Sequence, residues 1–191
     1  TEHVALHAKY ALVPSAPLER ELAAFTAWRT VPIDKTRRSS AVVPSTVQSD
    51  RERILRLMGW IDSMGKLPAT PSLAIFASPN IGTAAQRFTA MLVSKQGCSY
   101  ATAANHLSSF VFAARYAAIR CSKAPAIVVA ELESLHKQAK RQAKQEQLFN
   151  AAKQQGAVLS WDAMLQARVD AELAFKAYKG SDLKKKIRLV R

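Results

Sequence analysis

The sequence predicts an all-α protein, built as a multi-helix bundle. Hydrophobic residues recur at intervals of three and four through most of the chain, which is the period of an amphipathic helix. Between residues 15 and 120 no stretch alternates apolar and polar side chains convincingly enough for a strand. Hydrophobic residues form 49% of the 191-residue chain, which is ample for a buried core.

The first clear helix opens at Ser15 and Pro17 and ends near Arg29, with Leu18, Leu22 and Phe25 on one face. Residues 30–44 follow, with two prolines and two serines, and we expect a basic loop or arm there. Such an arm can lie along a phosphate backbone, and an ordinary solvated linker is the alternative. Its basic side chains are Lys35, Arg37 and Arg38.

A long helix is predicted from Ser45, as its N-cap, to about Met64. Val47, Ile54 and Ile61 share its inward face. Its flanks carry three arginines, Arg51, Arg53 and Arg56. Prolines and Gly65 then break the chain.

Two helices meet at Gly97, the first opening at Thr83 and the second running to Arg120 behind a cap at Ser99. The second helix has an apolar line at Ala103, Leu107, Phe110, Ala114 and Ala117. Beside it runs a line of short hydrogen-bonding side chains, Thr102, Asn105, His106 and Ser109, and the helix finishes with Arg115 and Arg120. This arrangement suits contact with a polar anion, and in so basic a chain DNA is the first candidate. An ordinary surface helix is the alternative.

Helical patterns continue to the end of the chain. The stretch that begins at Pro125 carries a basic stripe at i, i+3, i+4 and i+7, made of Lys137, Lys140, Arg141 and Lys144. The alternative for the stripe is a solvated face. Another helix runs from Ser160 to Gly180, and residues 183–190 keep helical spacing.

The charge balance points to a polyanionic partner. Lysine and arginine number 28 against 14 acidic residues, which gives a net charge of +14 and a pI of about 10.2. Residues 1–34 hold three basic and four acidic side chains, whereas residues 35–120 hold eleven and three, and residues 121–191 hold fourteen and seven. Nucleic acid and an acidic membrane surface both fit this balance, and the first segment is not expected to bind the anion.

Several kinds of function have no pattern in the sequence. Cys98 and Cys121 are too few for a disulfide framework, so we expect a reducing, intracellular compartment, the nucleus if the host is eukaryotic. The sequence has no run of about 18 apolar residues, so no membrane span is predicted. His3 and His7 have helical spacing without a third ligand, so no metal site and no cofactor is predicted. No phosphate loop, nucleophile elbow or paired carboxylates are found, and an enzyme is not expected.

The order of these pieces resembles the core-binding domain of tyrosine recombinases, a SAM-like helical domain found in Cre-type phage enzymes and Crypton-type mobile elements. The resemblance rests on the arginine-bearing helix that ends at Trp60, a proline-broken linker, a short helix, a glycine and a capped S-x-x-T-x-x-x-H-L helix start. That start reads Ser99, Thr102, His106 and Leu107. The LSWDAMLQA run, residues 159–167, looks like the start of the family's catalytic domain.

The resemblance implies a bundle that forms half of a clamp around duplex DNA, with two helices crossing at the major groove. Carried over by position, Thr102 and Asn105 would face bases or phosphates, with His106 and Ser109 beside them and the three arginines of residues 45–64 opposite. Ala101 stands where a relative has lysine, which puts one base contact in doubt. The family's catalytic arginines, histidine and tyrosine are not identifiable, so we expect DNA binding without cleavage.

We therefore divide the chain into an N-terminal helix and basic arm (1–44), a helical DNA-binding domain (45–123), and a linker helix with the start of a catalytic-like segment (124–191). The expected partner is double-stranded DNA, on which the chain could assemble as a homo-oligomer, with no membrane contact. The alternative is a basic helical protein that binds RNA or serves as an assembly factor.

Overall fold

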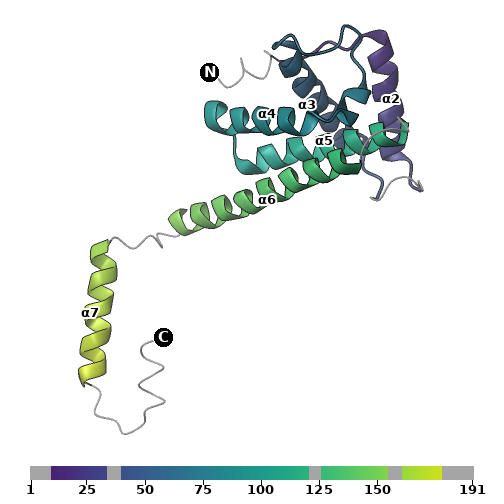
Figure 1. Cartoon of the computed structure of the whole chain (residues 1–191). Helices are drawn as coiled ribbons and strands as arrows, with labels where there is room; N and C mark the ends of the chain where they lie inside the picture. Colours follow the sequence, from purple (N-terminus) through teal and green to yellow (C-terminus); the bar gives the residue numbers. More distant parts are fainter. Residues whose placement is uncertain (1–9, 34–39, 121–125, 155–160, 178–191) are drawn as a thin grey trace. The chain divides into compact units, whose positions relative to one another are not determined.

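The computed structural model describes residues 10–33, 40–120, 126–154 and 161–177. Six α-helices and one 3-10 helix lie in these ranges, and no strand occurs in them, so the all-α prediction is confirmed. The helices are α2 (Ala16–Thr30), α3 (Pro44–Asp62), η1 (Leu73–Ala77), α4 (Ile81–Gln96), α5 (Tyr100–Arg120), α6 (Ala126–Gln154) and α7 (Trp161–Ala177) (Figure 1).

The chain divides into two compact units, Thr1–Lys144 and Gln145–Arg191. This division differs from the three domains expected from the sequence. Leu18, Leu22 and Phe25 of α2 are buried in the same core as α3, and Leu132 of α6 joins that core. The first unit therefore has one continuous core from α2 to the first half of α6.

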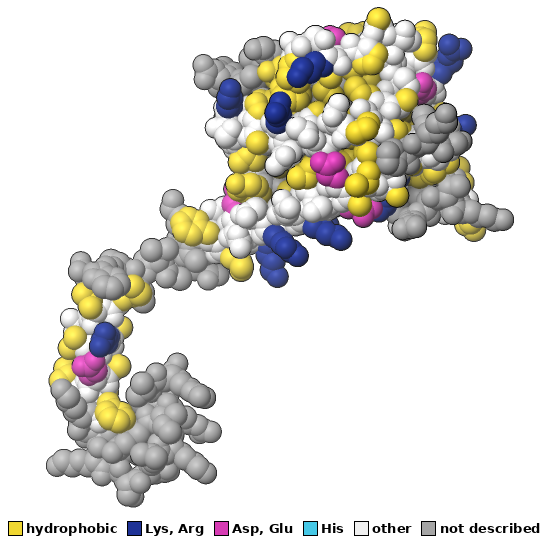
Figure 2. Space-filling model, viewed as in Figure 1, with side chains coloured by type: hydrophobic (Ala, Val, Ile, Leu, Met, Phe, Trp, Pro, Cys, Tyr) yellow, Lys and Arg dark blue, Asp and Glu magenta, His cyan; other side chains and the backbone are white. Residues whose placement is uncertain are grey.

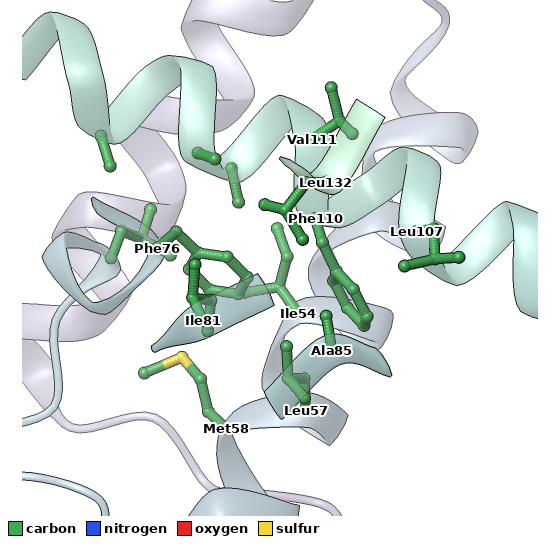
Figure 3. Close-up of a cluster of buried hydrophobic side chains, with 14 of the residues drawn as sticks. Ile54, Leu57, Met58, Phe76, Ile81, Ala85, Leu107, Phe110, Val111 and Leu132 are labelled. Carbon is green, nitrogen blue, oxygen red and sulfur yellow. The ribbon is translucent and has the colours of Figure 1, made fainter. Parts of the chain in front are cut away.

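Helix α5 is the centre of the first unit, because α3, α4 and η1 all pack against it (Figure 1). Phe110 of α5 is fully buried and points toward Leu57 of α3 and Ala85 of α4 (Figure 3). Its ring lies 6.0 Å from Phe76 of η1 and 6.2 Å from Phe88 of α4, measured between centroids. Four elements thus meet around one phenylalanine.

Helix boundaries follow local chemistry, with small differences from expectation. Gly97 adopts φ 63°, the left-handed conformation that ends α4, and the Cys98 N–H bonds to the Leu92 carbonyl. The Ser99 hydroxyl accepts a bond from the Thr102 N–H at 3.2 Å, so its predicted role as a cap is confirmed. Ser45 is not a cap, because α3 begins one residue earlier at Pro44, where proline is tolerated in the first turn.

Gly59 on α3 allows the N-terminal segment to approach the helix closely. A side chain there would collide with the backbone of Tyr10 and crowd that of Leu12. We expect Gly59→Ala to lower the free energy of unfolding by about 1–3 kcal/mol, since rigid backbone must move to admit a methyl group. Urea denaturation measures this. Gly82→Ala is the comparison, because its new methyl group meets only the flexible end of the Glu131 side chain, and an equal loss for both variants would contradict the prediction.

Candidate nucleic-acid interface

One side of α5 reaches the solvent, and we call it the α5 strip. It consists of Ala101, Asn105, Ser108, Phe112 and Ile119, which are three, four or seven residues apart and therefore share one face of the helix. Asn105 and Ile119 are exposed, and the other three are partly exposed. Thr102 lies partly exposed beside the strip, with its hydroxyl 3.2 Å from that of Ser99.

His106 and Ser109 do not belong to this surface, so the prediction that they face DNA is wrong. The His106 side chain is buried between Phe88 and Phe110, with ring centroids 5.7 and 6.0 Å away. Ser109 is fully buried and donates a hydrogen bond to Asp50 at 2.7 Å. Angle around the helix does not decide this, because Ser109 lies about 40° from Asn105 and the partly exposed Thr102 about 60°. Ser109 is buried because Asp50 of α3 packs against it, whereas Thr102 stands in the first turn of α5.

A buried ionic network fixes one border of the α5 strip. Arg29 of α2 is 2% exposed and donates to Asp50 of α3 at 3.1 Å. Asp50 also accepts from Ser109 and lies 3.6 Å from Arg53, which is itself 3.4 Å from the Ser109 hydroxyl. The Arg29 guanidinium stacks 3.5 Å above the Phe112 ring. This network joins α2, α3 and α5 and holds Arg53 at the edge of the strip.

The three arginines of α3 have different surroundings. Arg51 forms an ion pair with Glu19 of α2, so its charge is already matched within the protein. Arg56 is partly buried, and burial lowers the pKa of its guanidinium, with a further lowering from the neighbouring charge of Arg53. Arginine keeps its charge at neutral pH even so. Arg53 shares the single Asp50 carboxylate with Arg29, so this group keeps one positive charge in excess, and Arg53 and Arg56 are the cations that α3 offers along the strip.

Helix α6 forms the other border. Its inner face buries Val128, Leu132, Ala139 and Ala143 against the other helices of the first unit. Arg115 of α5 donates to Glu133 of α6 at 2.6 Å, which places α6 on the side of the strip opposite α3. The four residues of the predicted stripe, Lys137, Lys140, Arg141 and Lys144, all reach solvent, and in the part of the chain that the structure describes none of them has an ion-pair partner. Figure 2 shows lysine and arginine side chains gathered along α6.

The four residues of the stripe do not all point to the same side of α6. Lys140 lies one turn after His136, on the side of α6 that carries Glu133, the partner of Arg115. Arg141 instead lines a hollow of about 600 Å³ between α4, α5 and α6, together with Tyr100 and Leu107. Lys140 is therefore the stripe residue next to the α5 strip.

His136 makes stability depend on pH. Burial lowers its pKa, Lys140 and Arg115 lower it further, and Glu133 opposes them. In the window below the ordinary imidazole pKa, about 6.5, the unfolded chain binds a proton that the folded chain does not, so stability is lost as pH falls. We expect His136→Gln to lose less stability than the wild type between pH 7.5 and 5.5 in urea titrations. Parallel curves for the two proteins would contradict this.

Lys35, Arg37 and Arg38 lie outside the described residues. The ends of their segment are described, and the Val42 N–H donates to the Arg29 carbonyl at 3.2 Å.

Sequence reasoning missed Asp50, Glu19, Glu133 and Phe112, which position the cations of this surface. One signal was available: Asp50 lies three residues after Val47 and four before Ile54, so it falls on the inward line of α3. A carboxylate on that line requires a buried partner.

No group of three or more metal-binding side chains occurs among the described residues, and His3 and His7 lie outside them. None of the described helices combines the length and the apolar character that crossing a bilayer requires. No protein-family model, curated protein or solved structure matches the chain.

Proposed function

We propose that the chain binds double-stranded DNA through the α5 strip and the cations at its two borders. The observation that carries the proposal is an exposed amide, Asn105, on a helix face bordered by Arg53, with Arg56 one turn further along α3, on one side, and by the side of α6 that carries Glu133 and Lys140 on the other. Cations bind phosphates, and an asparagine amide can pair with adenine in the major groove. A net charge of +14 supports a polyanionic partner.

Burial decides which side chains recognise bases and which bind phosphates. Because only Asn105 and Thr102 of the polar line reach solvent, base recognition rests on these two side chains. Most of the affinity comes from phosphate neutralisation by the arginines and lysines, and it falls steeply with salt.

The proposal extends to the resemblance with tyrosine recombinases. In this reading residues 45–123 are a SAM-like core-binding domain, and the chain takes part in DNA recombination or integration by holding DNA rather than cutting it. Homo-oligomers on inverted half-sites belong to the same reading.

Asn105→Ala tests base recognition. We expect it to reduce the preference for the selected duplex over random duplex by about 1–3 kcal/mol, with little change in binding to random DNA. Selection from a random duplex library gives the preferred sequence, and fluorescence anisotropy gives both affinities. Equal losses on both DNAs would remove Asn105 from base recognition.

Arg56→Gln and Lys140→Gln test the borders in the same assay. Each should weaken binding to every duplex and reduce the slope of log affinity against log salt by about one. Arg20→Gln is the matched control, because Arg20 lines a separate hollow with Arg120, between α2, η1 and the end of α5. An equal effect at Arg20 would show that general charge binds the DNA. Tighter binding to RNA hairpins than to any duplex would instead favour the RNA-binding alternative.

A further inference from the structure

A second concave site lies on the first unit, formed by the ends of α3 and α4. Its volume is about 680 Å³, and its walls come from the C-terminal turns of α3, the segment that follows, η1 and the first turns of α4. Trp60, Ile61, Ile75 and Ile81 supply apolar surface. Ile61 and Ile81 are buried, while the Trp60 ring is partly exposed and held 5.7 Å from that of Phe88. Size and lining match those of small-molecule sites in proteins.

The charged side chains around this cavity have one sign. Lys66 and Arg87 line it, and no aspartate or glutamate does. Both cations are exposed, and neither forms an ion pair with any other described residue. Asn80 and Thr83 add hydrogen-bonding groups. An apolar floor beneath two unmatched cations complements a molecule with an apolar body and one negative end.

We propose that this cavity binds a small amphipathic carboxylate. Its apolar body lies against Trp60, Ile61 and Ile75, and its carboxylate faces Lys66 and Arg87. Arginine can hold a carboxylate through two parallel hydrogen bonds, and lysine adds a mobile positive charge. The cavity residues are not those of the α5 strip, so this site is independent of the proposed DNA binding.

Isothermal titration calorimetry of the full chain with three naphthalene compounds tests the proposal. The probes are 2-naphthylacetate, the neutral 2-naphthylethanol and the cationic 2-naphthylethylamine, which share one apolar body. We expect the carboxylate to bind most tightly and the amine most weakly. Equal affinities for carboxylate and alcohol, or no binding of the carboxylate, would overturn the proposal.

Variants then locate the site. Lys66→Gln and Arg87→Gln should each weaken the carboxylate about threefold and leave the alcohol unchanged, since exposed charge pairs contribute about 0.2–1 kcal/mol. Ala84→Phe fills the cavity and should abolish binding of both. Arg20→Gln is the matched control for general attraction to a basic protein, and an effect there as large as at Lys66 would refute the site. Because Lys66 and Arg87 are exposed, their variants decide the question even if Ala84→Phe does not fold.

Discussion

Asp50→Ala is expected to lower the free energy of unfolding by about 3–5 kcal/mol, because it leaves the buried Arg29 guanidinium without its carboxylate. The Asp50 side chain is 6% exposed, and the same carboxylate accepts the hydrogen bond of the buried Ser109. Removing it therefore takes the Asp50 carboxylate away from a buried charge, while the Ser109 hydroxyl keeps the Asn105 carbonyl, 3.1 Å away, as an acceptor. Urea denaturation followed by circular dichroism measures the loss.

Asp62→Ala on the same helix is the matched control, because Asp62 is exposed and the substitution removes the same group. It should change stability by less than about 0.5 kcal/mol. Arg29→Met combined with Asp50→Leu should recover much of the loss, since apolar side chains often replace a buried ion pair at little cost. A loss below about 1 kcal/mol for Asp50→Ala would show that water reaches the network.

Phe110→Ala is expected to cost a similar amount, about 3–5 kcal/mol, because it opens a cavity where four elements meet. Phe110 is fully buried, and its ring packs against Phe76, Phe88 and His106. The remaining rings cannot all close the space, since each belongs to a different element or an adjacent turn of α5. Thermal and urea unfolding both report the change.

Phe149→Ala makes the same substitution on a side chain that is 66% exposed, in the second unit. It should change stability by less than about 0.5 kcal/mol. If Phe110→Ala proves as mild as Phe149→Ala, the centre of the core does not lie at Phe110.

The helices and their inward faces could be predicted because the information is local. Val47, Ile54 and Ile61 repeat with the period of a helix, and all three are buried in α3. Gly97 ends α4 through its left-handed backbone conformation, and Ser99 caps α5 through its hydroxyl, as the sequence predicts. Each of these outcomes depends on neighbours within one or two turns.

The candidate site could be predicted only in part, because it depends on how the helices cross. Polarity alone put Asn105 and Ser109 on one surface, yet Ser109 lies against α3 and bonds to a residue 59 positions away. Likewise, the basic character of Arg51 gives no sign that Glu19 of α2 neutralises it. Asn105 and the stripe of α6 are exposed, since no other helix among the described residues covers them.

The hydrogen bond between Val42 and Arg29 has a consequence for the covalent chain. It joins the two sides of the connection between α2 and α3. Leu18, Leu22 and Phe25 anchor α2 in the core, and Asp50 binds Arg29 in the last turn of α2. Continuity of the polypeptide between Ile33 and Ser40 is thus not what retains α2. Two separately expressed pieces, split in that interval, should reassemble into one complex that survives gel filtration.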